Sequence, residues 1–78
     1  MNENNSWTGE HILLSRKILN VDQKQLALML GWTGKQNVSD LERGYKNKRP
    51  TTQTELSIEC LLRRSGLWDK FLKEKAKL

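Results

Sequence analysis

The chain has 78 residues, of which 36% are hydrophobic and 29% charged, so it is bounded to one small globular domain. One cysteine and one histidine exclude an internal disulfide and an ordinary Cys/His metal site, and no uncharged stretch is long enough to span a membrane. The net charge of +5 suits a polyanionic partner, although a modestly basic small protein is more often simply soluble.

One proline and five glycines divide the chain into segments of helical length, and almost no segment alternates as a strand does. We therefore predict an all-α domain of about five helices. Residues 1–8 are expected to form a flexible tail, disordered over 1–5, in which Trp7 can pack as a lid; residues 9–78 form the folded domain. Residues 1–5 lack the pattern of a signal peptide, so a cytoplasmic location is expected.

The first predicted helix covers 9–19 with Thr8 as its N-cap, and the second covers 23–30 with Asp22 as its N-cap. The third begins after Thr33, because Thr33-Gly34-Lys35-Gln36 fits a capping box, and it ends at Gly44. The apolar positions expected to face inward are Ile12, Leu13, Leu19, Leu26, Ala27, Leu30, Val38 and Leu41.

Two charged residues fall within these apolar stripes. Arg16 lies four residues after Ile12 on the first helix, and Glu42 follows Val38 by four residues on the third. A lone buried charge is costly, so the two side chains are expected to pair. The alternative is that both lie at the edge of the core and point to water.

The fourth predicted helix begins at Thr51 or Thr52, because Pro50 cannot continue a helix, and it runs to about residue 64. Its expected apolar face consists of Leu56, Ile58, Cys60, Leu61 and Leu62. Cys60 is interpreted as a small core residue rather than a nucleophile.

The last predicted helix covers 67–76 and carries apolar residues on one side and lysines on the other. Its apolar stripe consists of Leu67, Trp68, Phe71 and Leu72. In a small domain such a stripe closes the domain's own core, lies in a twofold dimer interface, or does both. Membrane binding is not favoured, because the apolar contact extends over only about one and a half turns.

Three stretches follow one another along the chain: Gln23-Lys-Gln-Leu-Ala-Leu-Met-Leu-Gly31, Val38-Ser-Asp-Leu-Glu-Arg-Gly44 and Lys48-Arg-Pro50. Together they resemble the phage repressor/Cro (XRE) family of helix-turn-helix DNA-binding proteins. That family's pattern is Q-x-x-L-A-x-x-x-G, then a β-branched residue with S-x-x-E-x-G, then a basic loop ending in proline. The resemblance covers about residues 9–64. It implies a lambda-repressor-like fold, with the helix-turn-helix formed by the second and third helices.

The resemblance also implies roles for individual residues. The third helix would enter the major groove of double-stranded DNA, and Arg16 and Glu42 match the family's structural ion pair. The positions that match base-reading residues are Lys35, Gln36, Asn37 and Asp40. The positions expected to contact phosphates are Gln23, Thr33, Ser39, Arg43, Lys46, Lys48 and Arg49. For any one of these residues the alternative is an ordinary helix start or a solvated helix face.

One departure from the shorter family pattern concerns the turn. Between Gly31 and Val38 the chain has one additional residue, so the base-reading positions could shift to Gly34 and Lys35 or to Gln36 and Asn37. Trp32 in this turn is interpreted as a core plug rather than a platform for bases.

These features favour a sequence-specific transcriptional regulator, a homodimeric repressor of a palindromic operator, of the small phage or mobile-element type and autoregulatory. No cofactor, metal or catalytic residue is expected, because no titratable cluster or pocket motif is present. The alternative is an antitoxin or another protein-interaction module whose main role is to bind a partner protein.

Overall fold

The computed structural model describes residues 7–78 as five α-helices joined by short turns. The helices are α1 (Gly9–Leu19), α2 (Gln23–Met29), α3 (Gln36–Arg43), α4 (Thr52–Arg64) and α5 (Trp68–Lys75), with a short 3-10 helix, η2 (Tyr45–Asn47), after α3. The described residues contain no strand, so the prediction of an all-α domain of about five helices is confirmed. Among these residues, none of the helices combines the length and the apolar composition needed to cross a membrane.

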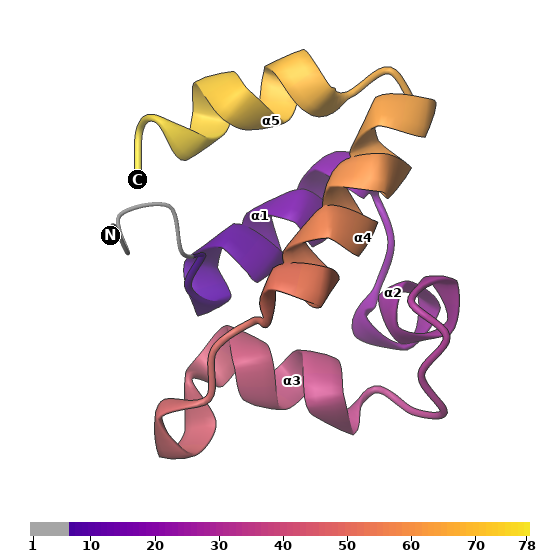
Figure 1. The fold of residues 1–78 in the computed structure, drawn as a ribbon, viewed down its shortest axis with the longest axis vertical. Helices are drawn as coiled ribbons and strands as arrows, with labels where there is room; N and C mark the ends of the chain where they lie inside the picture. Colours follow the sequence, from indigo (N-terminus) through magenta and orange to yellow (C-terminus); the bar gives the residue numbers. More distant parts are fainter. Residues whose placement is uncertain (1–6) are drawn as a thin grey trace.

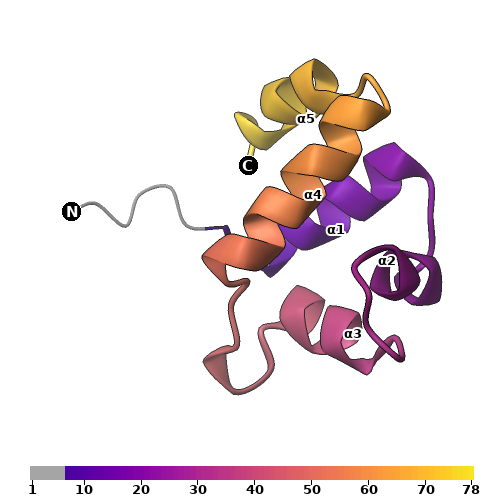
Figure 2. The ribbon, with the colours of Figure 1, turned by 45° about the vertical axis from the view of Figure 1, so that its right-hand side comes forward.

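The helices are arranged around α1 and α4, which cross the middle of the domain (Figure 1). Helix α3 lies along one side of this pair and α5 along the opposite side, and α2 adjoins α3. The view turned by 45° keeps the same order, with α5 at one end and α3 at the other (Figure 2). Because α1 and α4 separate them, the outer faces of α3 and α5 point in opposite directions.

Short polar side chains start three of the helices as the sequence predicts. Thr8, Asp22 and Thr51 accept hydrogen bonds from free backbone amides of α1, α2 and α4, respectively. The capping box predicted at Thr33 is wrong: α3 begins at Gln36, after Lys35, and no side chain caps it. The longer turn places Thr33 two residues before the cap position, and its hydroxyl forms none of the hydrogen bonds that cap α3.

The core receives at least one fully buried residue from every α-helix. Its buried hydrophobic side chains are Trp7, Ile12, Leu26, Ala27, Val38, Leu41, Ile58, Leu62 and Phe71. Ser15 is the buried polar residue among those described, and its hydroxyl donates to the carbonyl oxygen of Ile12 at 2.8 Å. A small residue with an internally satisfied hydroxyl suits the centre of α1, which is packed against helices on several sides.

Trp7 belongs to the folded domain and not to a flexible tail. Its side chain is 5% exposed, its ring lies 5.1 Å from that of Phe71, and its backbone N–H donates to Glu55 Oε2 at 3.0 Å. The predicted lid is thus confirmed, whereas the flexible tail predicted for 1–8 is wrong for its last two residues, because Trp7 packs against α5 and α4 and Thr8 caps α1. The disorder predicted over 1–5 lies outside the described residues.

The predicted apolar face of α4 is too wide. Ile58 and Leu62 are buried, but Leu56 is 60% exposed and Cys60 is exposed. Leu56 and Cys60 lie one turn apart on the face of the helix that points away from α1, and a helix packed on one side buries only one stripe. Cys60 is therefore not a core residue.

Candidate nucleic-acid interface

A short turn joins α2 to α3 and sets their relative position. Gly31 ends α2 with φ of +81°, a conformation that favours glycine, and the Trp32 N–H donates to the Ala27 carbonyl at 2.8 Å. The Trp32 side chain is partly buried and packs against the core, as expected for a plug. Helices α2 and α3 therefore pack against each other across this turn.

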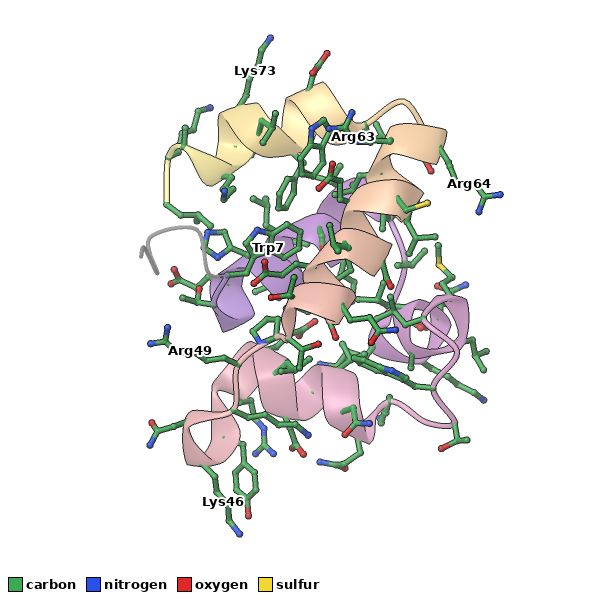
Figure 3. All side chains as sticks on the ribbon, viewed as in Figure 1. Trp7, Lys46, Arg49, Arg63, Arg64 and Lys73 are labelled. Carbon is green, nitrogen blue, oxygen red and sulfur yellow. The ribbon has the colours of Figure 1, made fainter. Side chains whose placement is uncertain are left out.

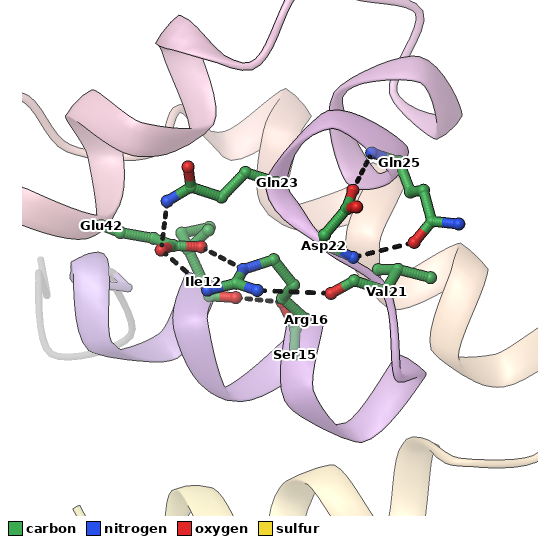
Figure 4. Close-up of polar contacts among 8 residues, drawn as sticks. All are labelled: Ile12, Ser15, Arg16, Val21, Asp22, Gln23, Gln25 and Glu42. Atoms are coloured by element: carbon green, nitrogen blue, oxygen red, sulfur yellow. Dashed lines mark hydrogen bonds and ion pairs between the residues drawn. The ribbon is translucent and has the colours of Figure 1, made fainter.

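The inner side of α3 is fastened to α1 by the predicted ion pair (Figure 4). Arg16 Nε lies 2.7 Å from Glu42 Oε2, and Arg16 Nη2 lies 3.3 Å from Glu42 Oε1. The two side chains are 20% and 8% exposed, so the pair lies at the boundary of the core, and hydrogen bonding to Glu42 raises the pKa of Arg16. The pairing prediction is confirmed.

Gln23 joins the same network from the start of α2. Its Nε2 donates to Glu42 Oε1 at 3.0 Å, so the side chain is directed to Glu42 (Figure 4). The resemblance assigned this residue to a phosphate. In the structure its side-chain amide is engaged with a carboxylate, which leaves its backbone N–H as the donor available at the N-terminus of α2.

The first residue of α1 also contacts the end of α3. A Cβ atom built on Gly9 would lie 2.6 Å from the carbonyl oxygen of Glu42 and would contact that of Leu41 as well. The absence of a side chain at Gly9 therefore lets the two backbones approach closely. Together with the Arg16–Glu42 pair, this contact fixes the orientation of α3 against α1.

The outer side of α3 is polar. Lys35, Gln36, Asn37 and Arg43 are exposed, and Ser39 is half-buried. Exposed and buried residues alternate along α3 with the period of a helix, because Val38 and Leu41 form the stripe that packs on the core. Four residues that the sequence assigns to DNA thus lie open along one helix.

Asp40 lies among these residues and is engaged by its neighbours. Its Oδ1 accepts from Gln36 Nε2 at 2.8 Å and from Arg43 Nη2 at 2.9 Å. These two hydrogen bonds, with the positive charge of Lys48 nearby, lower the pKa of Asp40. Asp40 consequently holds Gln36 and Arg43 side by side and offsets one positive charge.

The segment after α3 adds further positive charge beside it. Lys48 Nζ donates to Asn37 Oδ1 at 3.0 Å, which ties this segment to the start of α3. Arg43 and Lys46 lie over the ring of Tyr45, 5.1 and 5.4 Å from its centroid. We call the exposed set Lys35, Gln36, Asn37, Arg43, Lys46, Lys48 and Arg49 the α3 face.

At the edge of the α3 face, a surface hollow lies between the start of α2 and the turn. Its lining residues are Arg16, Asp22, Gln23, Lys24, Gly34 and Lys35. Lys24 was not assigned a role from the sequence, although it directly follows Gln23 in the first turn of α2. Thr33 is exposed in the adjoining turn.

The proposed dimer residues lie on the far side of the domain, on or next to α5. Phe71 is fully buried in the chain's own core and presents no surface to a partner. Leu67 and Trp68 are half-buried, and Leu72 is 40% exposed. The stripe therefore closes the core through Phe71, and Leu72 is the member that lies on the surface.

Seven of the eleven residues that the sequence assigns to DNA lie on the α3 face, and Gln23 lines the hollow beside it. Ser39 and Asp40 are half-buried on the same helix, and Thr33 is exposed in the turn. The side chain of Gln23 is held by Glu42 and is not free for a phosphate. Comparisons of the chain with protein-family models, with curated proteins and with solved structures find no match.

Proposed function

We propose that this protein binds double-stranded DNA sequence-specifically, with α3 in the major groove, and regulates transcription. The observation that carries the proposal is the two-sidedness of α3. Its inner side is fixed by Val38, Leu41 and the Glu42 ion pair, while its outer side is an open row of hydrogen-bonding side chains. A rigid helix with a free polar face is what reading base edges requires.

Base reading falls to the residues at the start of α3. The Gln36 amide can bond adenine bidentately, and Lys35 can donate to guanine O6 and N7. The hydrogen bond from Gln36 to Asp40 orients the amide before DNA arrives. Asn37 lies one position further along, where Lys48 holds its carbonyl oxygen and leaves its amide group to donate.

Phosphate contacts fall to the cations that border the helix. Arg43, Lys46, Lys48 and Arg49 follow one another from the end of α3 along the chain, and Lys24 lines the hollow at the start of α2. Phosphate contacts on both sides of α3 would fix the position and orientation of this helix on the duplex. Arg49 points outward from the domain, in keeping with a backbone or minor-groove contact (Figure 3).

The regulator is proposed to act as a homodimer on a palindrome, because one short helix reads too few bases for a specific site. Occlusion of a promoter by the bound dimer is the proposed mode of repression. Leu72, exposed on α5, is the first position to test for a dimer contact.

Selection from random duplex DNA tests the proposal, since it returns the bound sequence, its symmetry and its half-site spacing together. With the selected site, Gln36→Ala is expected to lose about 1–3 kcal/mol at one base position per half-site, and Lys48→Ala to weaken all sequences equally. Matched controls are Gln53→Ala on α4 and Lys17→Ala on α1, both exposed and away from the α3 face.

The affinity should also fall with salt by about 0.9 log units per log unit of salt for each phosphate neutralised. Asp40→Asn should raise affinity for unrelated DNA and reduce discrimination, because it removes the one carboxylate bonded within the α3 face. If selection returns no preferred sequence, or if Gln36→Ala and Gln53→Ala behave alike, α3 is not the reader.

A further inference from the structure

The positive charge of the chain is divided between two ends of the molecule. Residues 35–49 carry a net charge of +3 and residues 63–78 a net charge of +4, although the whole chain carries only +5. The first block forms much of the α3 face. The second block lies on α5 and the last residues of α4, at the end of the domain opposite to α3 (Figures 1 and 2). Figure 3 shows Lys73 and Lys46 pointing away from the domain at these two ends.

The second block has a defined geometry on α5. Lys70 and Lys73 are exposed on the helix and Lys77 is exposed directly after it, at spacings of three and four residues that form one stripe. Phe71, on the inward side of the same helix, is fully buried. The row therefore points away from the rest of the domain and extends about 10 Å along the helix.

The end of α4 carries a further exposed cation, which points to another side of the domain than Lys73 does (Figure 3). Arg64 is exposed and has no ion-pair partner among the residues described, and the same holds for Lys70 and Lys73. We call Lys70, Lys73 and Lys77 the α5 face. Arg63 is less available, since its Nε lies 2.6 Å from Glu59 Oε2 and its guanidinium lies over the Trp68 ring.

Acidic residues do not neutralise the α5 face. Glu74 lies 3.5 Å from Lys77, and both side chains are exposed, so the pair is weak. Asp69, in the first turn of α5, forms no ion pair within the part of the chain that the structure describes. Like charges three residues apart destabilise a helix, and a polyanion in contact with the row removes that repulsion.

We propose that the α5 face binds the phosphate backbone of a second DNA segment without sequence preference, so that the protein can join two duplexes. A row of about 10 Å spans about three successive phosphates of one strand along the duplex axis. The exposed apolar side chains near the row are Leu72 and Leu78, and two leucines are less than the apolar face with which a helix enters a lipid layer, which favours a nucleic acid over a membrane surface. A duplex held by the α3 face leaves the α5 face open, because the body of the domain lies between them. The candidate dimer residue Leu72 lies about 100° or more around the helix from each lysine of the row, so a dimer contact at Leu72 leaves the row exposed.

This inference rests on the proposed function only for the identity of the first duplex. It is tested by capture: a duplex with the selected site is fixed to beads, and a labelled duplex of unrelated sequence is added with and without the protein. The wild-type chain is expected to retain the second duplex at low salt and to release it as salt rises.

The variant Lys70→Gln/Lys73→Gln removes two charges from the α5 face. We expect it to bind the first duplex within about two-fold of wild type and to capture at least about five-fold less of the second. Lys17→Glu on α1 lowers the net charge by the same amount at an exposed position elsewhere, and it should capture normally. Equal capture by wild type and the double variant would overturn the proposal, since any bridging would then come from two α3 faces of a dimer.

Two further outcomes would also refute DNA binding by the α5 face. Loss of capture in Lys17→Glu as large as in the double variant would refute a localised face, because net charge alone would then decide. Binding to vesicles containing phosphatidylserine that depends on Lys70 and Lys73, without capture of a duplex, would refute a nucleic-acid partner.

Failure of the proposed function is distinguishable from these results. If no sequence is selected and Lys46→Gln/Lys48→Gln binds a single duplex as wild type does, DNA reading by α3 fails. A single-duplex titration of Lys70→Gln/Lys73→Gln then still reports on the α5 face, because it requires no specific site.

Discussion

Substitution of Gly9 by alanine tests how α1 holds α3 in place. The added Cβ would meet the backbone carbonyl oxygens of Leu41 and Glu42, the second of them at 2.6 Å. These atoms belong to the backbone of α3 and cannot rotate away as a side chain would. The clash can be relieved only if α1 and α3 move apart, which would also disturb the Arg16–Glu42 pair.

The magnitude follows from two opposing effects. Alanine in place of glycine in a helix contributes about 1 kcal/mol of stability, and overpacking a closely packed site costs about 1–3 kcal/mol. Because the clash is with backbone, we take the upper value and expect a net loss of about 2 kcal/mol. For a domain of this size that loss lowers the Tm by about 8–16 °C.

The assay is chemical unfolding followed by tryptophan fluorescence, with Gly34→Ala as the matched control. Gly34 has open space where a Cβ would lie and its φ is not positive, so the control should change stability by no more than about 1 kcal/mol, in the favourable direction. A Gly9→Ala variant as stable as wild type would refute the close approach of α1 to α3.

Three further changes test the packing and the electrostatics. Trp7→Ala should lower the free energy of unfolding by about 3–5 kcal/mol, since Trp7 is buried against Phe71; a loss below about 1 kcal/mol would restore the flexible-tail interpretation. Arg16→Met should lower the free energy of unfolding by about 3 kcal/mol, because it leaves the Glu42 carboxylate without its cation. The double variant Arg16→Met/Glu42→Leu should be more stable than Arg16→Met alone. Additive losses in a double-mutant cycle would contradict the pairing. Burial and, next, the charge of Lys75 lower the pKa of His11 below its ordinary 6.5, against the smaller opposing effects of Glu10 and Glu55. The unfolded chain therefore binds this proton more readily, and stability should decrease as the pH falls through and below 6.5. In His11→Gln the glutamine side chain can accept the hydrogen bond from the Thr8 N–H that His11 Nδ1 accepts in the wild type. The free energy of unfolding of this variant should therefore fall less than that of the wild type between about pH 7 and pH 5. Equal falls in the two proteins would contradict the role given to His11.

Local chemistry made several elements predictable. Thr8, Asp22 and Thr51 start helices because each offers a short side-chain oxygen to free amides, and Gly44 ends α3 because it adopts a positive φ. The Arg16–Glu42 pair was predictable as well. Two opposite charges in facing apolar stripes have few other ways to avoid an unpaired buried charge.

The errors arose where a local pattern does not report what distant segments do, and periodicity in particular gives the direction of a residue on a helix but not whether another helix covers it. Leu56 and Cys60 follow an apolar pattern, yet α1 packs on the stripe of Ile58 and Leu62 and leaves them exposed. The capping box at Thr33 fits a local motif, but Trp32 packs into the core and the turn continues for two more residues before α3 begins.

The amino-acid sequence alone determined the number of helices, the capped starts of α1, α2 and α4, the ion pair and the two basic blocks, because these depend on neighbours within a few turns or on charge that must be paired. Only the tertiary structure decided that Trp7 and Phe71 seal the same core, that Gln23 turns to Glu42, and that the basic blocks lie at opposite ends. Those outcomes depend on how α1 and α4 pack between α3 and α5. Because this close packing joins segments that are distant along the chain, the pattern of a single segment does not predict it.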